Sequence, residues 1–147
     1  MSACDVAVAA SDAKFATSEV RLGLIPATIG PYVVRAIGVR WARRLFQTGE
    51  RISAKRAEMI GLVHDCVEPE MLDGCVGEIV NDLLSGAPIA QKAAKELIDA
   101  VADRPITAEM IEYTAERIAV IRAAEEAREG LSAYLEKRKP NWTPRNS

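Results

Sequence analysis

Asp5-Val6-Ala7-Val8-Ala9-Ala10 is the stretch of sequence that most constrains the fold. It is short, apolar and partly β-branched, which is typical of a strand buried within a parallel sheet. A second short strand is expected at 14–17, Lys-Phe-Ala-Thr. One or two strands cannot satisfy their own backbone N–H and C=O groups, and so small a sheet is not independently stable. We therefore expect these strands to pair with another chain or with strands outside this sequence.

Three short helices are expected next, separated by glycines. Thr28 and Ser53 are the predicted N-caps of the first and third, because their hydroxyls can accept a hydrogen bond from a first-turn N–H. Gly38 is expected to end the first helix, since glycine tolerates the left-handed backbone found there. The expected ranges are 28–38 with Pro31 in the first turn, 39–47, and 53–61, followed by a short strand or turn at 62–63.

Four longer helices are expected after Pro69, where the hydrophobic pattern becomes regular. Apolar residues between Leu72 and Leu84 recur with the 3.6-residue period of a helix. Pro88 stands at the favoured first position of the following helix, and Pro140 is expected to stop the last one. The four expected ranges are 72–84, 88–101, 107–121 and 124–139.

These elements predict an α/β fold that this chain represents mainly by its helical C-terminal part. The chain is expected to be mostly α with one or two N-terminal strands, divided into residues 1–66, the remnant of a strand-containing core, and residues 67–147, a helical region for oligomerisation. Core packing is the default role of the apolar stripe from Leu72 to Leu84. A helical region separated from its sheet should nevertheless expose apolar surface, which predicts association.

Composition excludes several classes of protein. The net charge of −2 gives no electrostatic reason to expect a nucleic-acid partner. The three cysteines, Cys4, Cys66 and Cys75, lack the spacing of a disulfide framework or a zinc site. No apolar run approaches the ~20 residues that cross a bilayer, and the first residues have no signal-peptide pattern. We therefore expect a reduced, cytoplasmic protein without a membrane segment or a metal.

A group of basic residues and a single histidine are the remaining candidate binding features. His64 has no metal-spaced partners in the sequence, which favours a structural role. The basic residues fall on two or three helices and are interpreted first as a solvated face. Nucleic acid or the phosphate of a ligand is the alternative, and RNA is disfavoured by the acidic net charge and because the arginines lack aromatic stacking partners. The group comprises Arg35, Arg40, Arg43, Arg44, Arg51, Lys55 and Arg56.

Three sequence blocks together resemble the enoyl-CoA hydratase/isomerase (crotonase) family, in the family's order and spacing. Residues 4–26 begin Cys-Asp-Val-Ala-Val-Ala and end Phe-Ala-Thr-Ser-Glu-Val-Arg-Leu-Gly-Leu-Ile-Pro. Residues 48–54 are Thr-Gly-Glu-Arg-Ile-Ser-Ala, continuing to Gly-Leu-Val at 61–63. Residues 129–140 are Glu-Gly-Leu-Ser-Ala-Tyr-Leu-Glu-Lys-Arg-Lys-Pro. Within the family, residues 25–32 resemble hydratases of branched or carboxylated substrates such as methylglutaconyl-CoA.

The resemblance implies a crotonase-like spiral of ββα turns followed by helices, assembled as a homotrimer or hexamer. It implies the addition of water to a 2-enoyl-CoA thioester, with CoA as the carrier of the substrate and no further cofactor. Two glutamates then handle water and proton, and two backbone N–H groups polarise the thioester carbonyl. One glutamate and both amides belong to family segments that precede Cys4, so little hydratase activity is expected from this chain alone.

Four residues take family roles by position. Glu19 falls on the family's second glutamate. Ala27 falls where a backbone N–H helps to hold the water, although the family usually has Pro-Gly-x-Gly-Gly instead of Pro-Ala-Thr-Ile-Gly. Tyr134 and Lys137 fall on positions that reach the CoA of a neighbouring subunit, where lysine suits a phosphate. The alternatives are an enoyl-CoA isomerase, a non-catalytic oligomerisation module of a CoA-binding assembly, and an RNA-binding module.

Overall fold

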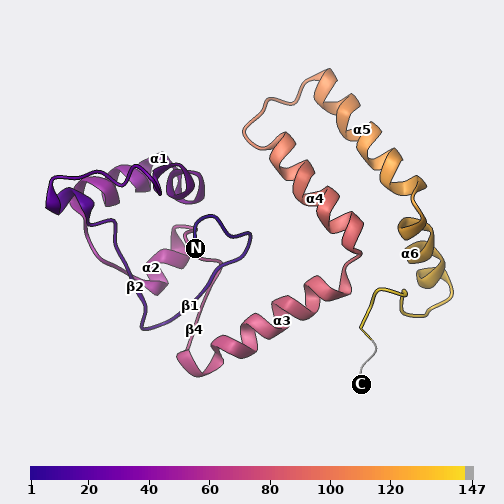
Figure 1. Ribbon diagram of the computed structural model, residues 1–147, viewed down its shortest axis with the longest axis horizontal. Coiled ribbons are helices and arrows are strands. Elements are labelled where there is room, and N and C mark those ends of the chain that lie inside the picture. The colour runs from indigo at the N-terminus through magenta and orange to yellow at the C-terminus, as the bar shows by residue number, and fades with distance from the viewer. Residues whose placement is uncertain (145–147) are drawn as a thin grey trace. The chain divides into compact units, whose positions relative to one another are not determined.

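A computed structural model describes residues 1–144 of the 147-residue chain (Figure 1). The chain divides into two compact units, Met1–Glu78 and a second unit from Ile79 onward. This division falls inside one long helix, whereas the expected division lies after Cys66, before that helix begins.

Four short strands lie in the first unit and form two separate pairs. β1 (Val8–Ala10) pairs in parallel with β4 (Asp65–Val67), which confirms the parallel pairing expected for the first strand. β2 (Lys14–Phe15) pairs antiparallel with β3 (Ile52–Ser53). The expectation that these strands lack partners within the chain is therefore wrong. Each pair is two strands wide and at most three residues long, so the pairs depend on helices packed against them.

The helices of the first unit follow the expected order, with one corrected cap. α1 (Gly30–Thr48) changes direction at Gly38, whose φ of 71° and ψ of 164° separate two helical segments as predicted. Its N-cap is Ile29 rather than Thr28, and no side chain caps it, because Thr28 lies one residue too early. α2 (Ala54–Met59) begins at Ser53, whose hydroxyl accepts a hydrogen bond from the Arg56 N–H at 3.2 Å.

The core of the first unit forms where α1 and α2 cover the strands. Its apolar side chains come from β1, from the inner face of α1 and from the segment 52–63. Ala54 and Ala57 are fully buried, because small side chains let α2 approach the strands closely. The buried set is Ala9, Val33, Ile37, Ala42, Leu45, Ile52, Ala54, Ala57, Ile60, Leu62 and Val63.

Two 3₁₀ turns complete the first unit. η1 (Glu19–Leu22) follows β2 and packs against α1. η2 (Pro69–Met71) leads into α3 (Leu72–Ser85), the helix that contains the sequence boundary between the two units.

The second unit consists of helices. α4 (Pro88–Val101), α5 (Ala108–Ala123) and α6 (Glu125–Leu135) pack against one another. Pro88 occupies the first turn of α4, and the Thr107 hydroxyl accepts a hydrogen bond from the Met110 N–H at 3.2 Å to cap α5.

The expected end of the last helix is wrong. α6 ends at Leu135 instead of near Lys139, because Lys137 adopts a left-handed backbone with φ of 54°. The Lys137 N–H then donates to the Tyr134 carbonyl at 3.2 Å, and the Arg138 N–H donates to the Ala133 carbonyl at 3.0 Å. These two bonds form a Schellman motif, which terminates a helix without proline.

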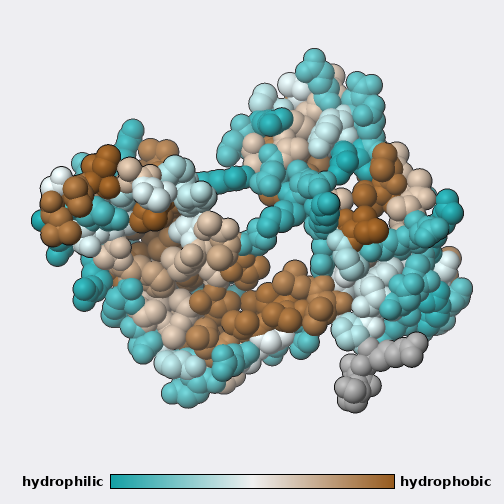
Figure 2. All heavy atoms as spheres, viewed as in Figure 1, coloured by the Kyte–Doolittle hydropathy of each residue, from teal (hydrophilic) through white to brown (hydrophobic). Residues whose placement is uncertain are grey.

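Much apolar surface stays exposed on the helices after Glu68. Val76, Val80, Leu83 and Leu84 are about half exposed, and Figure 2 shows an apolar band along α3. In α4 to α6, Ala133 is the only fully buried residue among those described. The stripe from Leu72 to Leu84 is thus not enclosed by core, and the expected exposure of apolar surface is confirmed. Among the described residues, no helix combines the length and hydropathy needed to span a membrane.

Candidate functional site

Glu19 opens the 3₁₀ turn η1 and carries an unsatisfied buried oxygen. The chain leaves β2 at Phe15 and reaches Glu19 four residues later. Oε2 of Glu19 is buried and makes no hydrogen bond with the part of the chain that the structure describes. A buried carboxylate oxygen without a partner is costly, so its partner must come from water, a ligand or another segment.

The position of Glu19 depends on a close approach between η1 and the end of α1. The Leu24 N–H donates to the Glu19 carbonyl at 3.0 Å, which closes the turn. Gly49 ends α1 with φ of 57°, and a Cβ there would lie 3.1 Å from Arg21 Nε and 3.3 Å from Val20 Cγ1. The backbone angle favours glycine at this position, and a Cβ there would require the Arg21 and Val20 side chains to shift by a few tenths of an ångström.

Ala27 lies in the loop that joins η1 to α1. Its N–H donates to the Ile25 carbonyl at 2.8 Å, so the amide assigned to the water takes part in a tight turn in this structure. Its methyl group is exposed, whereas Pro26 beside it is buried. The Gly30 N–H donates to the Pro26 carbonyl at 2.8 Å, which fixes the loop to the start of α1. Glu19 and Ala27 therefore belong to the same unit and to consecutive turns.

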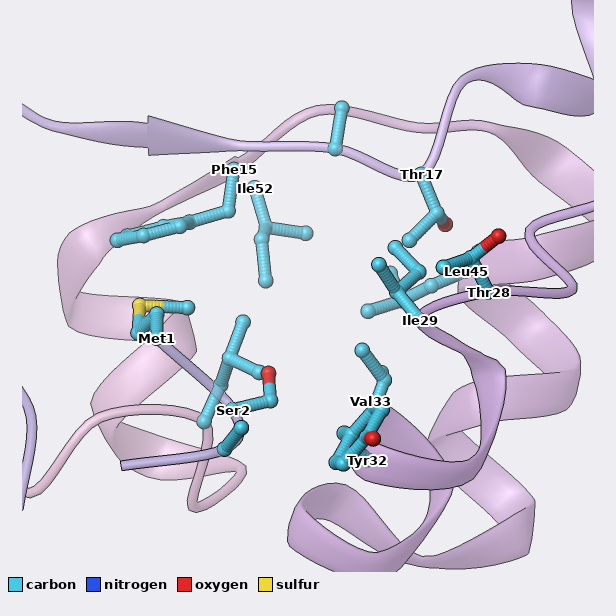
Figure 3. A pocket seen from close by; sticks show the side chains of 13 residues that line it. Met1, Ser2, Phe15, Thr17, Thr28, Ile29, Tyr32, Val33, Leu45 and Ile52 are labelled. Carbon is cyan, nitrogen blue, oxygen red and sulfur yellow. The ribbon is translucent and has the colours of Figure 1, made fainter. Parts of the chain in front are cut away.

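An apolar hollow of about 530 Å³ lies in the first unit beside this loop (Figure 3). Thr17, two residues before Glu19, projects from its wall and is only 8% exposed. Its Oγ1 is buried and has no hydrogen-bond partner in the described chain. No charged side chain lines the hollow, whose lining residues are Met1, Ser2, Ala3, Phe15, Ala16, Thr17, Thr28, Ile29, Tyr32, Val33, Leu45, Ile52 and Leu62.

Sequence reasoning missed Thr17. The sequence gives only a weak signal for Thr17, which is a hydroxyl residue at the end of the short strand expected at 14–17 and follows two apolar residues. Its burial depends on α1 residues far along the chain, which no local pattern shows.

Tyr134 and Lys137 lie in the second unit, at the end of α6. The Tyr134 side chain is exposed, with 81% of the residue's surface accessible, and Lys137 is exposed in the left-handed turn that follows. Arg138 binds Glu129 through two hydrogen bonds, of 2.7 and 2.9 Å, and also binds Glu136 at 2.6 Å. The hydrogen bond from Arg138 lowers the pKa of the Glu129 carboxyl. Tyr134 and Lys137 are thus accessible to a ligand, and the ion pair of Arg138 with Glu129 holds the turn that contains Lys137.

Two members of the basic group of the first unit form ion pairs. Arg44 binds Glu50, and Lys55 binds Glu58; each hydrogen bond lowers the pKa of the carboxyl group concerned. The expectation that these arginines lack an aromatic neighbour is wrong. The guanidinium carbons of Arg44 and Arg56 lie 5.6 and 5.7 Å from the centre of the Trp41 ring, on which they form cation–π contacts. These contacts occupy the ring, which leaves less of it for a base to stack on.

His64 has the structural role predicted for it. The Nδ1 of its imidazole accepts a hydrogen bond from the Ala7 N–H at 3.1 Å, and the backbone N–H of His64 donates to the Ala7 carbonyl at 2.7 Å. The imidazole thus extends the β1–β4 pairing by one residue. Among the described residues, no group of three or more His, Cys, Asp or Glu side chains could hold a metal ion.

Comparison with known proteins identifies the family. The family model described as enoyl-CoA hydratase/isomerase matches residues 1–145. The chain belongs to the enoyl-CoA hydratase/isomerase family. Its fold is the crotonase fold of a Legionella pneumophila enoyl-CoA hydratase/isomerase structure, with a TM-score of 0.92 and 45% identity over 96% of this chain and 54% of that one. The structure of a Shewanella pealeana enoyl-CoA hydratase has a TM-score of 0.90 and 42% sequence identity, over 96% of this chain and 52% of that one.

The curated relatives of this enoyl-CoA hydratase/isomerase family chain include several hydratases. A crotonyl-CoA hydratase of Syntrophomonas wolfei is 36% identical over 95% of this chain and 54% of its own length. A short-chain-enoyl-CoA hydratase of Clostridium acetobutylicum is 34% identical over 92% of this chain and 52% of its own length. The chain therefore spans about half the length of the curated relatives that it matches.

Proposed function

We propose that this chain contributes to an active site that hydrates 2-enoyl-CoA thioesters, with Glu19 as one of the acid–base carboxylates. The observation that carries the proposal is the buried, unpartnered Oε2 of Glu19 on a turn fixed by Gly49. Hydration needs a base to activate water and an acid to protonate the α-carbon, and a carboxylate can perform either step. A carboxylate with a free, shielded oxygen is suited to hold that water.

The apolar hollow beside Thr17 supports an acyl-CoA substrate. Its volume of about 530 Å³ falls within the ~300–1,000 Å³ typical of ligand pockets, and its walls are mostly aliphatic or aromatic. We assign it to the acyl chain. Tyr134 and Lys137 are the proposed contacts to the CoA of a neighbouring subunit, where an exposed lysine can pair with a phosphate. CoA serves as the carrier of the substrate, and no other cofactor is proposed.

The remaining chemistry is assigned to residues outside this sequence. A second carboxylate and two amide donors for the thioester oxygen are expected there, and loss of one such donor typically lowers kcat by ~10²–10³. Incubation of the purified chain alone with crotonyl-CoA should therefore show little hydration. Normal turnover would contradict this assignment.

A chimera tests the role of Glu19 directly. Residues 1–144 of this chain replace the matching part of the Clostridium acetobutylicum relative, and hydration of crotonyl-CoA is followed by the loss of enoyl-thioester absorbance. Glu19→Gln should lower kcat by ~10²–10⁴, the usual contribution of a general acid or base. Glu68→Gln is the control, because Glu68 is exposed on a different segment, where its side chain accepts a hydrogen bond from the Ser11 hydroxyl at 3.0 Å. A folded chimera in which Glu19→Gln keeps full activity would exclude the proposal.

Isomerisation is the second candidate, favoured by one relative. A trans-2-decenoyl-[acyl-carrier-protein] isomerase of Streptococcus mutans is 30% identical over 96% of this chain. A single glutamate can move a proton between two carbons, so Glu19 could serve that reaction as well. Product analysis of the chimera separates the two, since a hydratase forms a 3-hydroxyacyl thioester and an isomerase only shifts the double bond.

We further propose that the protein assembles as a homotrimer or hexamer in the cytoplasm. The half-exposed apolar residues of α3 and the scarcity of buried residues in α4 to α6 support association. Fatty-acid or branched-chain amino-acid degradation is the proposed setting, because both produce enoyl-CoA thioesters. A non-catalytic oligomerisation module is the alternative. It predicts that light scattering shows an oligomer and that Glu19→Gln leaves the hydration rate of the chimera unchanged.

A further inference from the structure

A small, basic cavity of the first unit is lined by residues of α1, of the segment that follows it and of α2. Its volume of about 200 Å³ is below the ~300–1,000 Å³ typical of pockets for whole small molecules, so it suits a single small group. Three guanidinium groups and one carboxylate line it, which leaves a net charge of +2. The lining residues are Trp41, Arg44, Glu50, Arg51, Ile52, Ser53 and Arg56.

Two of the three arginines are held in place by their neighbours. The guanidinium carbons of Arg44 and Arg56 lie 5.6 and 5.7 Å from the centre of the Trp41 ring. Arg44 also donates two hydrogen bonds to the Glu50 carboxylate, the one from Nη2 at 3.1 Å. The charge of Glu50 is therefore already balanced by Arg44. The remaining positive charge of the lining comes from Arg51 and Arg56.

Three side chains of the lining have hydrogen-bond donors to spare. Within the described chain, the guanidinium groups of Arg51 and Arg56 form no hydrogen bond or ion pair, and both residues are exposed. The Ser53 Oγ accepts a hydrogen bond from the Arg56 backbone N–H at 3.2 Å, which leaves its hydroxyl proton free to be donated. Unused donors of Arg51, Arg56 and Ser53 thus line one cavity.

We propose that this cavity binds a phosphate group, either inorganic phosphate or a phosphate monoester, through Arg51, Arg56 and Ser53. A planar guanidinium group can donate two parallel hydrogen bonds to phosphate oxygens. A phosphate group carries up to two negative charges at neutral pH, which match the net charge of the lining, and its oxygens accept several hydrogen bonds. Arg44 keeps its bonds to Glu50, so the anion does not displace an existing ion pair.

The bound group would also restrain the turn next to η1. Arg51 is two residues from Gly49, against which Val20 and Arg21 of η1 pack. A ligand that binds only the folded chain raises its stability, so phosphate should raise the thermal unfolding temperature. Sodium chloride at the same ionic strength should not, because it only screens charge.

Nuclear magnetic resonance of the unaltered chain tests the inference at the cavity itself. The chain has two tryptophans: Trp41 lines the cavity, and Trp142 lies in the second unit. Sodium phosphate is added while sodium chloride keeps the ionic strength constant. The indole N–H signal of Trp41 should shift and reach saturation, whereas that of Trp142 should stay in place.

Substitutions of two exposed arginines assign the binding to the cavity. Arg51→Gln should weaken phosphate binding about tenfold or more, the worth of a hydrogen bond to a charged group. Arg43→Gln is the matched control, because Arg43 is exposed on α1 but does not line the cavity. Both variants lose one positive charge, so the difference between them measures contact rather than overall charge. Arg56→Gln is a second variant and should act as Arg51→Gln does.

CoA and dephospho-CoA distinguish the two sources of the phosphate group. A monoester site should bind CoA more tightly than inorganic phosphate and lose that advantage with dephospho-CoA, which lacks the ribose phosphate. A site for the free anion should bind inorganic phosphate at least as tightly as CoA. The inference is overturned if neither phosphate nor CoA gives a saturable shift of Trp41. It is also overturned if Arg51→Gln binds phosphate no more weakly than Arg43→Gln.

Discussion

Arg138 and Glu129 form a two-bond ion pair, with Nη1 2.7 Å from Oε1 and Nη2 2.9 Å from Oε2. The pair joins the middle of α6 to the segment just after it. Glu129 also accepts a hydrogen bond from the Asn141 N–H at 2.9 Å. Lys137 lies in the sequence between Glu129 and these two partners, in a left-handed backbone conformation. The ion pair therefore fixes the turn that presents the proposed CoA contact.

The first prediction concerns the pH dependence of this pair. The hydrogen bond from Arg138 lowers the pKa of Glu129 in the folded chain. The stabilisation of the folded chain by this ion pair is therefore complete above the ordinary Glu pKa of ~4.3. It is lost as the pH falls below that value toward the lowered pKa. In urea unfolding, Glu129→Gln should be less stable than the unaltered chain at pH ~6, with a smaller difference at pH ~3. Glu112→Gln, exposed on α5, is the control and should show no such convergence. A difference for Glu129→Gln that is the same at both pH values would contradict the assignment.

The second prediction separates backbone strain from charge at Lys137. A non-glycine residue in the left-handed region costs ~1 kcal/mol or more, so Lys137→Gly should raise the free energy of unfolding by about that amount. Lys137→Ala removes the same charge but keeps the strain, and should not stabilise. If Lys137 contacts CoA, both variants should bind CoA more weakly. Thermal unfolding and CoA titration measure the two effects independently; equal stability of the two variants would argue against strain.

The third prediction compares two glycines. Gly49→Ala places a methyl group 3.1 Å from Arg21 Nε at a backbone φ of 57°, and should destabilise the chain by ~1–2 kcal/mol. Gly74→Ala, inside α3 with no atom within 4 Å of the new methyl, should stabilise by ~0.5–1 kcal/mol. Chemical denaturation gives both values. In the chimera, Gly49→Ala should also reduce turnover, because it displaces the turn that carries Glu19. Stabilisation by both substitutions would show that the approach at Gly49 is not tight.

Local signals predicted the helices of this chain well. Ser53 caps a helix and Pro88 begins one, as expected, because these effects depend on atoms within one turn. The end of α6 was wrong because a Schellman motif at Lys137, flanked by the pairing of Arg138 with Glu129, stops the helix before Pro140 does.

The strands and the site were less accessible from the sequence. β3 has two residues and β4 has three, and they are strands only because β2 and β1 lie beside them in the fold. Glu19, Ala27, Tyr134 and Lys137 came from the resemblance rather than from a pattern of chemistry, and their roles stay predictions. Burial of Thr17 depends on packing against α1, so only the structure revealed it.

The last prediction tests how the helices of the second unit hold together. The carboxylate of Glu126, on α6, accepts hydrogen bonds from the first-turn N–H groups of Ile89 at 3.0 Å and Ala90 at 2.9 Å, on α4. α4 has no side-chain cap of its own, so Glu126 supplies one from another helix. Glu126→Ala should cost ~1–2 kcal/mol, as the loss of an N-cap does.

Glu125→Ala is the matched control for this cap. Both glutamates lie in the first turn of α6, where each contributes ~0.3–1 kcal/mol through the helix dipole. The difference between the two variants therefore isolates the bonds to α4. Amide hydrogen exchange at Ile89 and Ala90 should accelerate in Glu126→Ala and remain unchanged in Glu125→Ala. Equal exchange in both variants would mean that α4 keeps its first turn without help from α6, and that apolar packing alone joins the two helices.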